Sequence, residues 1–84
     1  MTPSGLRVDH SLDVRGLGSP ASYRRVIEQL HQMIENEVLE LSIDDGESLR
    51  TVPFALRAEG HEILVSEPAN NGVRLLVRKR SLAA

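Results

Sequence analysis

The side chains in this sequence that could do chemistry are a serine ahead of a proline, three histidines and a pair of aspartates. Ser19-Pro20 follows a glycine-rich stretch, and a serine hydroxyl there could act as a nucleophile if a general base and an oxyanion hole lay beside it. The same dipeptide is a helix-start signal, because serine accepts hydrogen bonds from free backbone N–H groups and proline suits the first helical position. We therefore interpret Ser19 as a helix cap.

The histidines and aspartates do not form a recognisable metal or acid–base motif. His10, His31 and His61 match no metal-ligand spacing, and no cysteine accompanies them, so we expect structural or surface roles. Asp44-Asp45 could be a paired-carboxylate site. It also precedes a glycine at the end of an alternating segment, where aspartate is typical of a turn. We expect a turn there, and neither a metal nor a cofactor.

Basic residues gather at two places in the sequence. Arg15, Arg24 and Arg25 are expected near the start of the first helix, and Arg78-Lys79-Arg80 ends the last predicted strand. Together they could bind an anionic partner, either an RNA or an acidic protein. The net charge of −2 and the two aromatic residues provide neither a basic field nor a stacking platform, so nucleic acid is the less favoured partner.

Composition sets further bounds on the class of protein. The 84 residues suit one small domain, and a hydrophobic content of 40%, almost all of it aliphatic, is enough for a core. The absence of cysteine excludes disulfides, thiolate zinc sites and cysteine nucleophiles. No apolar run approaches the roughly 20 residues that span a bilayer, and no apolar signal core follows the first residues. We expect a cytoplasmic protein with no membrane partner.

Periodicity predicts the elements that must position these side chains. A helix should begin at Ser19 and close in a left-handed turn at Asn36. A second should cover 48–59, with Thr51 near its cap and with Pro53 either kinking it or starting its regular part. Alternating apolar residues predict four strands, over about 8–14, 39–43, 63–65 and 73–77.

The predicted order is β-α-β-α-β-β, which is an α/β two-layer sandwich. The first two strands should be parallel because a helix joins them, and the last two antiparallel because a short turn joins them. Two helices can cover one face of the four-stranded mixed sheet, so the other face should be open. We expect a flexible lead-in over 1–7, the domain over 8–80 and a tail over 81–84.

Leu64 and Leu76 are the apolar residues predicted on that open face, where polar residues are more usual. Both fall on the outward side of their strands, and a hairpin centred near Asn70 would place them opposite each other. They are candidates for a partner or dimer surface, although exposed leucines are also ordinary on their own.

Several segments, in this order and spacing, resemble the TusA/SirA sulfur-carrier family. The similarity covers about residues 9–80. The segments that carry it are Leu12-Asp13-Val14-Arg15-Gly16-Leu17 with Ser19-Pro20, then Asp44-Asp45, Val52-Pro53-Phe54 and Gly60-His61, and finally Lys79. The resemblance implies the same two-layer fold that the periodicity predicts.

The resemblance also implies a chemistry that this chain lacks. Family members accept a persulfide sulfur from a cysteine desulfurase on the cysteine of a Cys-Pro-x-Pro motif, where a helix N-terminus stabilises the thiolate. Here the motif reads Ser19-Pro20-Ala21-Ser22, and Gly46 stands where the family often has proline. A serine hydroxyl cannot form a persulfide, so the fold carries over and the sulfur chemistry does not.

We expect a non-catalytic protein-binding or regulatory module related to sulfur-relay proteins, with a cysteine desulfurase or another relay protein as its partner. An alternative is a Cys-to-Ser form of a sulfur carrier, and a weaker alternative is an RNA-binding module. The expected binding residues are Arg15, Ser19, Pro20, Arg24 and Arg25. The sequence does not fix the oligomeric state.

Overall fold

A computed structural model describes residues 7–80 of the chain. The lead-in and the tail expected from the sequence lie outside these residues, apart from Arg7. The helices and strands follow the predicted order: β1 (His10–Asp13), α1 (Ser19–His31), β2 (Val38–Ile43), α2 (Glu47–Ala58), β3 (Glu62–Ala69) and β4 (Gly72–Arg78). Among them, neither helix has the length and apolar content needed to cross a membrane.

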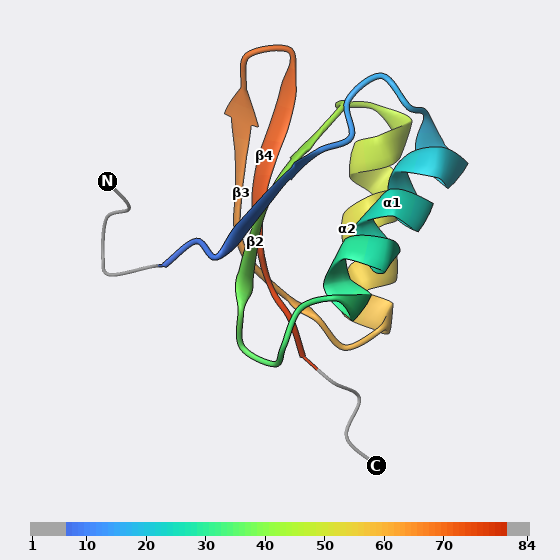
Figure 1. Cartoon of the computed structure of the whole chain (residues 1–84). Coiled ribbons are helices and arrows are strands. Elements are labelled where there is room, and N and C mark those ends of the chain that lie inside the picture. Colours follow the sequence, from blue (N-terminus) through green and yellow to red (C-terminus); the bar gives the residue numbers. More distant parts are fainter. Residues whose placement is uncertain (1–6, 81–84) are drawn as a thin grey trace.

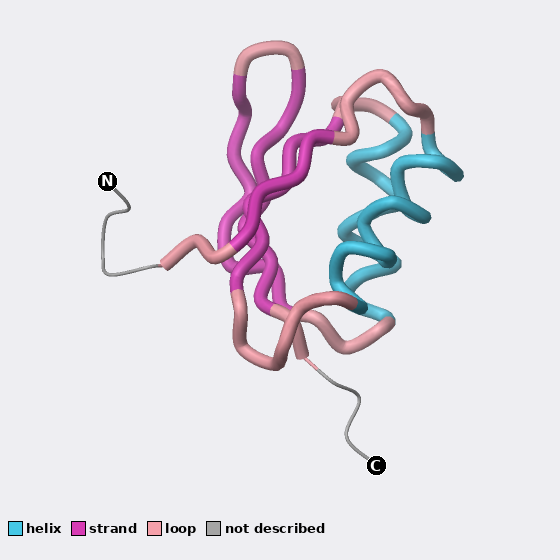
Figure 2. Tube along the Cα trace, in the orientation of Figure 1, coloured by secondary structure: helices cyan, strands magenta, loops and turns pink. Residues whose placement is uncertain are grey.

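The four strands form one mixed sheet in the order β1-β2-β4-β3. β1 runs parallel to β2, and β4 runs antiparallel to both β2 and β3. Both helices cover one face of this sheet, and within residues 7–80 no helix covers the other face (Figures 1 and 2). The predicted α/β two-layer architecture is therefore confirmed.

The core lies between the sheet and the helices, where the alternation of apolar residues placed it. Leu39, Leu41 and Ile43 of β2 are fully buried, as are Leu30 of α1 and Leu56 of α2. These aliphatic side chains belong to one continuous cluster. Their burial is the main favourable term for a domain of this size.

Helix α1 begins and ends differently from the prediction. Gly18 occupies the N-cap position, with a φ of 82°, and Ser19 is the first helical residue, so the prediction that Ser19 is the cap is wrong. The Gly18 carbonyl accepts the first helical hydrogen bond, from Ser22 N–H at 2.9 Å. The helix ends at His31, before the left-handed turn at Asn36, and this leaves Ile34 70% exposed.

Helix α2 contains Pro53 in its interior rather than at its start. Gly46 takes the N-cap position with a positive φ of 85°, and Glu47 follows in the first turn, where an acidic residue interacts favourably with the helix dipole. Thr51 was expected near the cap. It lies one turn further on, and its hydroxyl donates to the Glu47 carbonyl at 3.0 Å.

The open face of the sheet differs from the prediction at both of its leucines. A β-bulge at Leu64 shifts the register of β3, so Leu76 pairs with Val65 rather than with Leu64. Leu76 is also only 1% exposed. Arg74 and Arg78 lie two residues before and after Leu76 on β4, so the three residues share one face of the sheet. As a result, Leu76 offers almost no surface to a partner.

Ion pairs tie these arginines to neighbouring strands. Arg74 pairs with Glu40 of β2 at 2.6 Å and with Glu67 of β3 at 3.0 Å, and Arg78 pairs with Glu62 at 3.1 Å. The charges of this face are therefore largely matched within the chain.

Candidate functional site

Three loops meet at one end of the sandwich, where α1 starts. They are the β1–α1 loop over 14–18, the β2–α2 loop over 44–46 and the β3–β4 turn over 70–71. Figure 1 shows all three at the same end of the sheet. They meet there because β1, β2 and β3 run in the same direction, and each of the three loops follows one of these strands. Residue 19, the position of the family's acceptor cysteine in the resemblance, lies directly after the first of these loops.

The β1–α1 loop has a backbone shape that depends on glycine. Val14 is 1% exposed and its N–H donates to the Ser42 carbonyl at 2.9 Å, which anchors the loop to β2. Gly16 and Gly18 both have positive φ, at 87° and 82°, a conformation that other residues adopt only with strain. The two glycines thus turn the chain sharply from the sheet into α1.

Arg15 ties this loop to the hairpin turn. Its guanidinium donates two hydrogen bonds to the Asp13 carboxylate, from Nε at 2.9 Å and from Nη2 at 2.7 Å. Nη1 donates to the Asn70 carbonyl at 3.0 Å. The guanidinium bonds and then the Arg15 backbone N–H hold the pKa of Asp13 at about 2. Arg15, predicted as a binding residue, is therefore engaged within the chain.

The β2–α2 loop is joined to the same structure through Asp44. Its Oδ2 accepts a hydrogen bond from the Gly16 N–H at 2.8 Å. The predicted turn over Asp44 and Asp45 is observed, and Asp44 gains in it a role that sequence spacing did not indicate. Gly72 also permits this arrangement, since a Cβ there would collide with the Ile43 carbonyl oxygen and contact the Arg15 side chain.

The surface beside residue 19 combines apolar groups with charged groups of both signs. Leu17 is 47% exposed in the loop. Pro20 and Arg24 follow on α1, and together with Tyr23 and Ile27 they line a groove of about 600 Å³. The groove was not predicted from the sequence, because Tyr23 and Ile27 were assigned wholly to the core stripe.

Arg24 and Arg25 lie on α1 as expected but differ in their partners. Arg25 approaches Glu28 at 3.4 Å, one turn along the helix. No ion pair is found for Arg24 within residues 7–80, so its charge is available to a partner. Of the predicted basic residues near α1, Arg24 is the one that the described part of the chain leaves unmatched.

The basic cluster Arg78-Lys79-Arg80 lies at the other end of the sandwich from the basic residues near the start of α1. The two clusters therefore do not form one surface. β4 runs antiparallel to β2, and this places Arg78 beside Val38 at the start of β2. Arg80 approaches Glu35 at 3.5 Å, and Lys79 Nζ donates to the Leu30 carbonyl at 2.6 Å. This carbonyl also accepts from the Met33 N–H at 3.1 Å, so Lys79 adds a second hydrogen bond in the last turn of α1, where a positive charge also suits the helix dipole.

The three histidines do not converge on a metal site. His10 Nε2 lies 3.0 Å from Glu37 Oε1, and His61 Nδ1 accepts from the Arg80 N–H at 3.1 Å. Burial lowers the pKa of His61, and the charge of nearby Lys79 lowers it further. Within residues 7–80, no group of three potential ligands could hold a metal ion.

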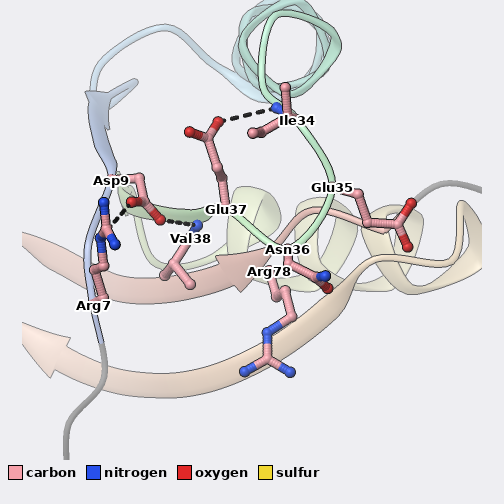
Figure 3. A pocket seen from close by; sticks show the side chains of 8 residues that line it. All are labelled: Arg7, Asp9, Ile34, Glu35, Asn36, Glu37, Val38 and Arg78. Carbon is pink, nitrogen blue, oxygen red and sulfur yellow. Dashed lines mark hydrogen bonds and ion pairs between the residues drawn. The ribbon is translucent and has the colours of Figure 1, made fainter.

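A second hollow, of about 380 Å³, lies at this far end (Figure 3). Two of its carboxylates already form hydrogen bonds or ion pairs within the chain. Asp9 accepts from the Val38 N–H at 2.8 Å and pairs with Arg7 at 2.9 Å, and Glu37 accepts from the Ile34 N–H at 3.0 Å. The hollow is therefore an unconvincing ligand site, and the end that carries residue 19 is the stronger candidate.

Comparisons with known proteins agree with the resemblance in the sequence. The sequence model of the family described as "Sulfurtransferase TusA" matches residues 10–79. The chain is also similar to a protein of Archaeoglobus fulgidus named "Putative sulfur carrier protein". The two are 29% identical over 76 residues, which is 89% of this chain and 86% of that protein.

Proposed function

Because this chain belongs to the TusA sulfurtransferase family, we propose that it is a non-catalytic member that binds a protein of a sulfur relay. The observation that carries the proposal is the combination of an ordered loop before residue 19 with the complete absence of cysteine. Sulfur transfer onto a carrier forms a persulfide on a cysteine thiolate, and no residue here can form one. Binding is the part of the family's activity that the residues present can still perform.

The surface proposed for binding surrounds the start of α1. Leu17 and Pro20 supply exposed apolar area, and Arg24 supplies a cation with no ion pair in the described residues. An apolar centre beside an arginine is the usual composition of a protein-binding surface. A cysteine desulfurase or another relay protein is the proposed partner, and it would meet this surface in the cytoplasm.

The test is a direct titration of the purified chain against a cysteine desulfurase, by calorimetry or interferometry. Arg24→Glu should weaken binding by tenfold or more, because it reverses the available charge at the proposed surface. Arg80→Glu makes the same change on an exposed position at the opposite end of the sandwich and should leave binding intact. Equal affinities for the two variants, or no binding by the unaltered chain, would refute the proposal.

A Cys-to-Ser form of a working sulfur carrier is the second candidate function. It is supported by the loop, which Asp44, Arg15 and the glycines hold in a defined shape with residue 19 at its end. Restoring a thiol at residue 19 tests this candidate. RNA binding has less support, because the two basic clusters lie at opposite ends and Arg78 and Arg80 are paired with acidic residues.

A further inference from the structure

The outer surface of the helical layer carries a protruding aromatic side chain and a groove. Phe54 of α2 is 67% exposed. Arg50 and Arg57 lie four residues before it and three after it, so both share its side of the helix. Neither arginine forms an ion pair with any other residue between 7 and 80. Phe54 is therefore an apolar projection with a positively charged surround.

The groove, which is lined mainly by residues of α1, has complementary chemistry. Pro20, Tyr23 and Ile27 of α1 give it an apolar lining, and Glu28 and Glu59 contribute carboxylates, alongside Arg24 and His31. Burial raises the pKa of Tyr23, and the negative charge of Glu59 raises it further, so that carboxylate acts on the groove itself. No ion pair is found for Glu59 among the described residues.

We infer that this helical face binds a second copy of the same chain. Phe54 of each protomer enters the groove of the other, and Arg57 of each faces Glu59 of the other. The argument for a second copy is that one chain supplies both an exposed aromatic group with unmatched arginines and an apolar groove with an unmatched carboxylate. A buried aromatic anchor with opposite charges around it is the usual centre of a protein interface.

In a reciprocal pair, the contact of Phe54 with the groove and the contact of Arg57 with Glu59 each form twice. The dimer is therefore closed by twofold symmetry. α1 and α2 form the layer opposite the open face of the sheet (Figure 1). Phe54 and most of the groove residues belong to these two helices, so one pair of facing helical layers contains all four contacts. The interface would also cover Pro20 and Arg24. Self-association and binding of a relay protein should therefore compete for this surface.

The first experiment compares the unaltered chain with two variants by sedimentation equilibrium. The unaltered chain should reach a monomer–dimer equilibrium, and Phe54→Ala should raise its dissociation constant by about tenfold or more. Ile34→Ala is the matched control, since Ile34 is similarly exposed, at 70%, but follows the end of α1 and lines the hollow at the far end rather than the groove. A chain that stays monomeric at about 1 mM, or forms open polymers, would overturn the inference.

The second experiment uses charge reversal, and both positions are exposed, so the fold should be retained. Arg57→Glu alone and Glu59→Arg alone should each be monomeric, because every contact then joins like charges. An equimolar mixture of the two variants should dimerise, because both contacts then join opposite charges. Dimerisation of either variant alone to the level of the unaltered chain, or no rescue in the mixture, would contradict the proposed pairing. Circular dichroism checks that each variant is folded.

Discussion

The substitution Ser19→Cys tests whether the start of α1 still supports the sulfur chemistry of the family. The new thiol would lie on the first residue of a 13-residue helix, where the dipole favours a negative charge. A helix N-terminus stabilises such a charge by about 0.3 to 1 kcal/mol at a surface position, and one pKa unit corresponds to about 1.36 kcal/mol. The pKa of the thiol in Ser19→Cys should therefore fall by about 0.2 to 0.7 below that of an unperturbed cysteine.

The matched control is Ser66→Cys, on an exposed position of β3 and away from any helix N-terminus. The pH dependence of alkylation by iodoacetamide gives both pKa values, and the Ser19→Cys value should be the lower one. Incubation with a cysteine desulfurase and cysteine should then add the mass of one sulfur to Ser19→Cys and none to Ser66→Cys. Equal pKa values would refute the dipole argument. If an authentic family member gains sulfur in the same tube and Ser19→Cys does not, the site has diverged beyond the thiol.

Four further predictions follow from single contacts. Leu41→Ala should lower the free energy of unfolding by roughly 2 to 5 kcal/mol in urea titrations, since Leu41 is fully buried. Lys79→Met should cost about 0.5 to 1.5 kcal/mol in the same assay, because the Leu30 carbonyl loses the hydrogen bond from Lys79 Nζ and keeps the one from the Met33 N–H. Ser19→Ala should change stability by less than about 0.5 kcal/mol, because Gly18 holds the cap position. In an NMR titration the Asp13 carboxyl should titrate near pH 2; the lowered pKa contributes stability above the ordinary value of 3.8, and this contribution is lost as the pH falls towards 2.

The sequence predicted the fold because its apolar residues clearly follow the period of two residues that is typical of strands and the period of 3.6 that is typical of helices. Leu39, Leu41 and Ile43 alternate with polar residues in β2, and all three are fully buried in the structure. The parallel pairing of β1 and β2 followed from the helix between them, which leaves few other connections. These inferences use local patterns and chain connectivity, and both are fully present in one sequence.

Other features depended on details that periodicity does not carry. Ser19 and Gly18 are adjacent, and a shift of one residue decides which of them is the cap. The bulge at Leu64 changes the register of β3 without changing its composition, so the pairing of Leu76 could not be read from alternation. The hydrogen bond from Arg15 to the Asn70 carbonyl joins residues 55 positions apart, and no local pattern indicates it.

The shape of the site does not depend on the residue at position 19. The loop before it is set by the positive φ of Gly16 and Gly18, by the Asp44 carboxylate and by the Arg15 guanidinium, none of which requires a thiol. Loss of the cysteine therefore removes the sulfur chemistry and leaves the loop, the first turn of α1 and the nearby groove in place. The binding that we propose for this surface requires the loop and the groove but no thiol, so the lack of cysteine does not argue against it.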